Sequence, residues 1–161
     1  FLGTTDREKF TVLQWLMFQM GGLGPMLGQA HHFRIYAPEQ IDYAVTRYTN
    51  EAKRLYGVMD KQLALGKYIA GNTYTIADMA IWPWYGSLAK GERYDSGEFL
   101  QVHEYTHVIR WADEIEARPA VQRGRMVNRV IGPPHTQLHE RHDASDFLHR
   151  TQDKLNGQTT A

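Results

Sequence analysis

Residues 38–66 carry the clearest periodicity in the chain. Their apolar positions recur every three or four residues, the spacing that places side chains on one face of an α-helix: Ile41, Val45, Tyr48, Ala52, Leu55, Met59 and Leu63. Pro38 suits the first turn of a helix, whose amides lack an intrahelical partner, and Gly66 suits a left-handed position at the end. The pattern predicts a long helix that buries one side, and with it a helical fold.

Two further helices are marked by capping boxes at their starts. The hydroxyl of Thr5 can accept a hydrogen bond from the amide of Glu8, while the Glu8 carboxylate reaches back to Thr5. Thr75 and Asp78 form the same signature ahead of a strongly apolar run, so both are assigned structural capping roles. The first of these helices is expected to bend at residues 21–25, where glycines and a proline interrupt it.

The remaining elements are shorter. Residues 105–115 predict a fourth helix, and residues 118 to about 127 predict a short one. The helix after the second capping box is expected to be central, buried and kinked by Pro83. Strand patterns are almost absent, so the chain is predicted to be all-α. Residues 128–161 are polar and include Gly132-Pro133-Pro134, which indicates an extended tail that wraps the helical domain.

Charge balance and the lack of cysteine exclude several kinds of function. Lysine plus arginine and aspartate plus glutamate each total 18, so the net charge is zero, which argues against nucleic acid or an anionic membrane as partner. Without cysteine the chain supplies no disulfide, no thiolate metal ligand and no catalytic thiol. The longest uncharged stretch, from Phe10 up to Arg34, is broken by glutamines, glycines and a proline and is not predicted to span a membrane.

Some histidines have the spacing of metal ligands. His135, His139 and His142 stand four and three residues apart, so a helix would place them on one face. However, they follow two prolines in the predicted tail and lack the glutamate of an HExxH motif. His103 and His107 are also four residues apart, but they too are not assigned as metal ligands, so no metal site is predicted.

The run Gly71-Asn72-Thr73-Tyr74-Thr75-Ile76-Ala77-Asp78 resembles the hallmark of the C-terminal domain of glutathione transferases, in which a threonine cap and an aspartate precede a buried helix. Trp111, followed by Arg118-Pro119-Ala120-Val121, is similar to the end of that domain. The match covers most of residues 5–127. It implies a glutathione transferase C-terminal-type helical bundle over residues 1–127, with a long, kinked first helix, and a C-terminal extension over residues 128–161.

A narrower resemblance rests on Leu13-Gln14-Trp15-Leu16, residues 21–29, His31-His32-Phe33, Arg47-Tyr48 and Ala80-Ile81-Trp82-Pro83-Trp84. Together these runs are similar to the bacterial nu-class of the family, whose members are glutathione-dependent disulfide-bond oxidoreductases. Residues 138–147 are similar to a C-terminal extension found on some members.

The resemblance implies that this chain is the helical half of an enzyme that reduces small disulfides with glutathione. The family places a thioredoxin-like N-terminal domain, not present in this chain, before the helical one, and assembles as a homodimer in the cytoplasm. The chain opens at Phe1 directly before a helix start, which we interpret as a domain boundary. The other half would activate the glutathione sulfur, so this chain alone is expected to be inactive.

The lack of cysteine is compatible with that reaction, because glutathione and the substrate bring the exchanging sulfurs. Glutathione is then a co-substrate, and no metal is required. A hypothesis of a different class is a stand-alone helical domain used for binding or assembly, without catalysis. It predicts an apolar face that is available to a partner.

The family pattern assigns glutathione binding to Arg47, whose guanidinium can pair with a peptide carboxylate through two hydrogen bonds. Spacing alone favours a surface arginine paired with Glu51, four residues on, and both interpretations stay open. The candidate pocket residues are Met26, Gln29, Phe33 and Trp84, each of which also fits ordinary packing. No catalytic residue is assigned in this segment.

Overall fold

A computed structural model describes residues 1–91, 96–127, 129, 132–134 and 137 of the chain. The chain divides into two compact units, Phe1–Asp113 and Glu114–Ala161. No β-strand occurs in the described ranges, where Tyr68 and Gly71 pair in an isolated antiparallel bridge. The predicted all-α fold is confirmed.

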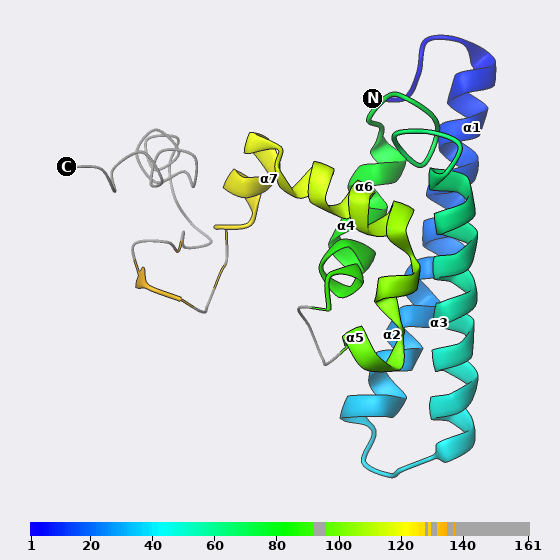
Figure 1. Cartoon of the computed structure of the whole chain (residues 1–161), viewed down its shortest axis with the longest axis vertical. Coiled ribbons are helices and arrows are strands. Elements are labelled where there is room, and N and C mark those ends of the chain that lie inside the picture. Colours follow the sequence, from blue (N-terminus) through cyan, green and yellow to red (C-terminus); the bar gives the residue numbers. More distant parts are fainter. Residues whose placement is uncertain (92–95, 128, 130–131, 135–136, 138–161) are drawn as a thin grey trace. The chain divides into compact units, whose positions relative to one another are not determined.

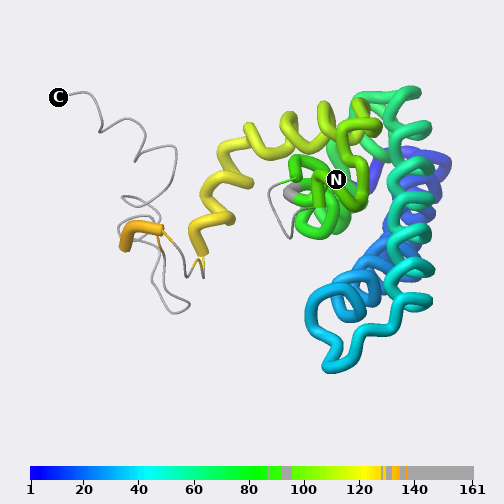
Figure 2. The backbone as a smooth tube through the Cα atoms, turned by 60° about the horizontal axis from the view of Figure 1, so that its bottom comes forward, coloured from blue at the N-terminus to red at the C-terminus, as the bar shows by residue number. Residues whose placement is uncertain are grey.

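The first unit begins with two antiparallel helical arms. Its elements are α1 (Asp6–Phe18), the π-helical turn η1 (Gln19–Leu23), α2 (Gly24–His31), the π-helical turn η2 (His32–Tyr36), α3 (Asp42–Leu63), α4 (Ile76–Ala89), α5 (Ser96–Phe99), the 3-10 turn η3 (Val102–Glu104) and α6 (Thr106–Glu116), which continues into the second unit. Figures 1 and 2 show α3 returning beside the arm formed by α1 and α2. None of the helices in the described ranges is both long enough and apolar enough to cross a lipid bilayer.

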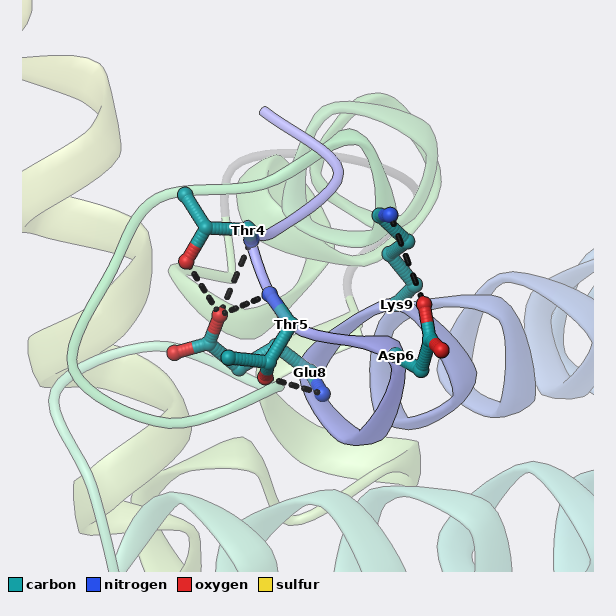
Figure 3. A network of polar contacts seen from close by, with 5 residues as sticks. All are labelled: Thr4, Thr5, Asp6, Glu8 and Lys9. Carbon is teal, nitrogen blue, oxygen red and sulfur yellow. Dashed lines mark hydrogen bonds and ion pairs between the residues drawn. The ribbon is translucent and has the colours of Figure 1, made fainter.

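The start of α1 is held by the predicted capping box (Figure 3). The amide of Glu8 donates to the hydroxyl of Thr5 at 3.3 Å, and the amide of Thr5 donates to Glu8 Oε2 at 2.9 Å. Thr4 adds two bonds that the sequence did not indicate, because its amide and hydroxyl donate to the same oxygen at 2.9 and 2.8 Å. The amides of Thr4, Thr5 and Glu8 at the start of α1 therefore have partners within the same turn.

The first arm is one long helix interrupted at the predicted bend. Pro25 has no amide hydrogen, and its ring would clash with the carbonyl of Gly21, four residues earlier, in a regular α-helix. The chain widens instead into η1, where the amide of Gly24 donates to the carbonyl of Gln19, five residues earlier. The kink in the first helix is thus a π-helical turn with a proline just after it.

The start of the long helix differs from the prediction. α3 begins at Asp42, not at Pro38, and Ala37 has an extended backbone with φ −62° and ψ 137°. A proline disfavours the helical conformation of the residue before it, so η2 cannot continue into Pro38. The side-chain amide of Gln40 donates to Asp42 Oδ1 at 3.1 Å, which joins the connecting loop to the start of α3.

The end of α3 also differs. The helix ends at Leu63, and Gly66 does not adopt the left-handed conformation that its position suggested. Glycine is needed at position 66 because the backbone of Gly71 packs closely against it: a Cβ on residue 66 would lie 2.9 Å from the carbonyl oxygen of Gly71. One guanidinium nitrogen of Arg110, from α6, donates to the carbonyls of Leu63 and Gly66 at 2.9 and 3.0 Å. A side chain distant in the sequence therefore caps this helix end.

The core of the first unit forms where α4 meets the arms. Its largest fully buried side chains include Leu23, Leu27, Leu55, Tyr56, Met59, Leu63, Ile81, Tyr85 and Trp111. The predicted stripe of the long helix is buried from Ala52 onward, whereas Ile41 is 43% exposed because it precedes the helix. Pro83 lies inside α4 as expected.

In the second unit, α7 (Pro119–Gly124) follows Arg118, whose backbone is extended. The helix ends at Gly124, three residues before the predicted end near Val127. Arg125 forms an ion pair with Glu116. Most of the predicted tail, residues 128–161, lies outside the described residues, and so do His135, His139 and His142.

Candidate functional site

Arg47 lies on an exposed part of α3, one turn before Glu51. Glu51 is bound by a different arginine, because Nε and Nη2 of Arg54 donate to its two carboxylate oxygens at 2.8 and 2.7 Å. These bonds hold the pKa of Glu51 below its usual range, and the positive charge of Arg47 adds a smaller effect. The alternative of an Arg47–Glu51 pair is wrong. Within the described part of the chain, Arg47 makes no hydrogen bond or ion pair, and its guanidinium is exposed to solvent.

An aromatic pair lies next to Arg47 in the sequence. The ring of Phe33 in η2 stacks on the ring of Tyr48 in α3, with centroids 5.4 Å apart and planes at 5°. The guanidinium of Arg34 lies 3.9 Å from the ring centroid of Phe99 in α5, a cation–π contact. These two contacts fix η2 against α3 and α5, and they bring the candidate pocket residue Phe33 onto the helix that carries Arg47.

Three of the candidate pocket residues share one face of the first arm. Met26, Gln29 and Phe33 are spaced by three and four residues, so they lie in a row. Gln29 is exposed, and Met26 and Phe33 are half-buried. The adjoining side of α2 carries Leu27 and Ala30, which are buried. The row is therefore accessible to a ligand while the rest of α2 is held in place.

Trp84 lies at the bend of the same arm. It is 43% exposed, and a Cβ added to Gly24 would lie 3.8 Å from its Cε2 atom. Trp82 points elsewhere, because its indole nitrogen donates to the carbonyl of Ala112 in α6 at 3.1 Å. The two tryptophans do not form a common aromatic wall, since residues two apart on a helix face different ways. Only Trp84 lies beside the bend that leads into the row of Met26, Gln29 and Phe33.

Three tyrosines form a cluster that the sequence did not single out. The ring of Tyr56 lies 4.5 Å from that of Tyr85 and 5.2 Å from that of Tyr105. Each hydroxyl donates to a backbone carbonyl: Tyr56 to Tyr85 at 3.1 Å, Tyr85 to Leu23 at 3.3 Å and Tyr105 to Lys53 at 3.3 Å. Burial raises the pKa of all three hydroxyls, so they remain protonated donors at neutral pH. A tyrosine in a strongly apolar helix signals a buried hydroxyl that needs a partner, but not which partner.

Asp78 occupies the third position of α4 and is fully buried. Its Oδ2 atom accepts from the amide and the hydroxyl of Thr75, both at 3.0 Å. Its Oδ1 atom accepts from the amide of Ile69 and from the indole nitrogen of Trp111, both at 2.9 Å. This carboxylate therefore caps α4 and also ties the preceding loop and α6 to it.

The described residues hold no group of three or more histidine, cysteine, aspartate or glutamate side chains that is placed to bind a metal. His103 and His107 belong to that described part of the chain. The charged and aromatic groups that face solvent around η2 and α3 suit an organic anion, because a guanidinium binds carboxylates and the stacked rings offer apolar area.

Sequence comparison relates the chain to glutathione S-transferases. Residues 42–114 match the family model described as Glutathione S-transferase, C-terminal domain. The disulfide-bond oxidoreductase YghU of Escherichia coli (strain K12) is 54% identical over 158 residues, which cover 98% of this chain and 54% of that protein. The disulfide-bond oxidoreductase YfcG of the same strain is 44% identical over 120 residues, which cover 74% of this chain and 53% of that protein.

Solved structures of glutathione transferases are also similar to this chain. The glutathione transferase YghU from Streptococcus pneumoniae, complexed with glutathione, superposes with a TM-score of 0.73 at 48% identity and covers 77% of this chain and 48% of its own. A glutathione transferase family member from Pseudomonas fluorescens, with two glutathione bound, gives a TM-score of 0.71 at 42% identity. The match covers 76% of this chain and 54% of that one. The chain spans about half the length of the curated relatives it matches. The chain therefore belongs to the glutathione S-transferase family, and its residues 42–114 match the C-terminal domain of that family.

Proposed function

We propose that this chain is the helical half of a glutathione-dependent disulfide-bond oxidoreductase that reduces small disulfides. The observation that carries the proposal is the 54% identity to the disulfide-bond oxidoreductase YghU, which extends over 98% of this chain. The exposed Arg47, which precedes Tyr48 of the Phe33–Tyr48 stack in the sequence, supports it, because a guanidinium can bind the carboxylates that glutathione carries.

The chemistry requires two successive thiol–disulfide exchanges. The thiolate of one glutathione attacks a sulfur of the substrate disulfide, which forms a mixed disulfide and releases the first substrate thiolate. The thiolate of a second glutathione attacks the glutathione sulfur of the mixed disulfide, which releases the second substrate thiolate and forms glutathione disulfide. Two related structures support this stoichiometry, one with two glutathione bound and one from Pseudomonas putida with one glutathione disulfide bound per subunit.

In this proposal Arg47 binds a carboxylate of glutathione, and Met26, Gln29, Phe33 and Trp84 line the pocket for the disulfide. A guanidinium presents a rigid fork of donors and keeps its charge, so it orients the peptide without taking part in sulfur chemistry. The residue that activates the glutathione sulfur belongs to a thioredoxin-like domain outside this chain, which is why the chain alone is expected to be inactive. No metal is needed for either exchange.

The whole protein is proposed to be a cytoplasmic homodimer in which residues 1–127 form the helical domain and residues 128–161 an extension. Exposed apolar side chains support a partner surface along α1 and η1, here named the α1 stripe: Phe10, Leu13, Met17 and Met20. Their spacing of three, four and three residues reads the same in both directions, so a copy related by a twofold axis would place Phe10 opposite Met20 and Leu13 opposite Met17. No Asp, Glu, Lys or Arg occurs in residues 10–33, so like charges would not face each other there.

A stand-alone binding or assembly domain also predicts such an apolar face, but the relatives favour the enzyme. The direct test is glutathione-dependent reduction of bis(2-hydroxyethyl) disulfide by the protein that carries both domains. Turnover supports the oxidoreductase. A folded dimer that binds no glutathione and reduces no disulfide would overturn it.

Arg47→Ala tests the assigned contact. Loss of a charge-assisted, two-bond contact is expected to weaken glutathione binding by roughly tenfold or more, measured by isothermal titration calorimetry. The matched control is Lys61→Ala, which removes an exposed cation from the last turn of the same helix, away from Glu51, and which should bind glutathione as the unchanged protein does. Unaltered affinity of Arg47→Ala would show that Arg47 is only a surface charge.

A further inference from the structure

The bend in the first arm is held from α4 by two neighbouring side chains. The hydroxyl of Tyr85 donates to the carbonyl of Leu23, the last residue of η1, at 3.3 Å. Trp84 lies near the next residue, Gly24: a Cβ added there would be in ordinary van der Waals contact with the Trp84 ring, at 3.8 Å, and unusually close to Nε2 of Gln19, at 3.0 Å. Tyr85, Leu23 and Gly24 are all buried. Neighbouring residues of α4 therefore pack against the junction between η1 and α2.

This junction sets which residues of α2 face outward. A π-helical turn holds one residue more than an α-helical turn, and each residue of an α-helix turns the face by about 100°. A shift of η1 to α-helical register would therefore rotate α2 by about 100° and carry Leu27 and Ala30 off the core. The row of Met26, Gln29 and Phe33 would rotate with them. The orientation of the candidate pocket thus depends on η1 keeping its π-helical register.

We propose that Tyr85 is a positioning residue for the disulfide pocket: Pro25 disfavours the α-helical register of η1, and the Tyr85 hydroxyl fixes the resulting π-helical turn to α4, so that Met26, Gln29 and Phe33 are presented to the substrate. The inference rests on the proposed function. Tyr85 does not touch the substrate in this account, because it is fully buried and acts through the Leu23 carbonyl. Its hydroxyl stays protonated, since burial raises its pKa, and so it remains a donor.

The test is Tyr85→Phe in the protein that carries both domains. The variant keeps the ring and removes only the hydroxyl. Tyr56→Phe is the matched control, because it removes an equally buried hydroxyl of the same cluster that donates to Tyr85 of α4 and not to η1. For bis(2-hydroxyethyl) disulfide, Tyr85→Phe is expected to raise KM about fivefold with kcat within about twofold, the size of effect that one lost hydrogen bond produces. Tyr56→Phe is expected to leave KM unchanged at a similar loss of thermal stability.

Hydrogen exchange of backbone amides gives a second readout that does not depend on catalysis. Amides of residues 19–30 should exchange faster in Tyr85→Phe than in Tyr56→Phe, because η1 opens more often. Equal KM and equal exchange in the two variants would overturn the inference, as would a Tyr85→Phe variant that loses stability with KM unchanged. If the unchanged protein reduces no disulfide, the proposed function fails, and the role of Tyr85 in the pocket fails with it. The hydrogen-exchange measurement still shows whether the Tyr85 hydroxyl stabilises η1.

Discussion

Glu8 shows how strongly bonds within one turn perturb a carboxylate that is fully exposed. Its Oε2 atom accepts hydrogen bonds from the amide of Thr5 and from the amide and hydroxyl of Thr4 (Figure 3). These bonds lower the pKa of Glu8 from its usual 4.5 to about 2, and the bond from the Thr5 amide has the largest effect. The donors favour the charged form, so ionised Glu8 stabilises the start of α1.

Replacing Glu8 by glutamine is expected to make stability less sensitive to acid. Folding lowers the pKa of Glu8, so its contribution is fully present above pH 4.5 and is lost as the pH falls through about 2. Glu8→Gln should therefore unfold at a lower temperature than the unchanged chain near neutral pH and at nearly the same temperature at about pH 2. Thermal unfolding across this range checks the prediction, with Glu39→Gln in the exposed loop before α3 as control. A difference that is constant with pH would show that the charge of Glu8 plays no part.

At the scale of elements, α4 organises the first unit. Asp78 of α4 accepts hydrogen bonds from the preceding loop and from α6. Tyr85 and Trp84 of α4 lie against the bend of the first arm. Pro83 inside the helix removes an amide between these two sets of contacts. Contacts on both sides of the proline therefore compensate for the hydrogen bond that α4 lacks.

Asp78→Ala is expected to destabilise the protein far more than Thr75→Ala. Losing the Thr75 cap should cost about 1 kcal/mol. Losing Asp78 leaves the buried donors of Ile69, Thr75 and Trp111 without their acceptor, so the expected cost is about 3 kcal/mol or more. Urea unfolding measures both free energies.

Asp113→Ala serves as the control, because it removes an exposed carboxylate whose ion pair with Lys90 is 3.2 Å long and should cost less than about 1 kcal/mol. A large loss of catalysis in Asp78→Ala with unchanged stability would contradict the structural role assigned to this carboxylate.

At the scale of the whole molecule, the α1 stripe is the surface proposed to bind a second copy of the protein. Phe10, Met17 and Met20 are 72%, 57% and 61% exposed, and Leu13 lies between them on the same face. A continuous apolar row on a helix otherwise surrounded by polar residues is typical of an interface, whereas isolated exposed apolar residues are common.

Met17→Glu is expected to weaken self-association of the full protein by tenfold or more, since it places charge at the centre of the stripe, close to its own copy. Sedimentation at several concentrations measures the dimer constant. The control is Leu65→Glu, which changes an isolated apolar residue that is 82% exposed and should leave the dimer unchanged. A Met17→Glu protein that dimerises normally would place the interface elsewhere.

The sequence by itself determined the elements and the family. Capping boxes, apolar periodicity and proline act within one or two turns, so the starts of α1 and α4, the bend before Pro25 and the long α3 were all predictable from neighbouring residues. Where the prediction failed, at Pro38 and Gly66, the local signal was compatible with more than one conformation.

Only the tertiary structure decided which partner each side chain takes. Arg54 rather than Arg47 binds Glu51, although both arginines lie within about one turn of it on the same helix. The hydroxyl of Tyr85 meets the carbonyl of Leu23 across 62 residues, and Arg110 caps α3 across 47. Helix formation depends on residues three or four apart, whereas the Tyr85 and Arg110 contacts depend on how finished helices pack, as does the stacking of Phe33 on Tyr48 beside the proposed pocket.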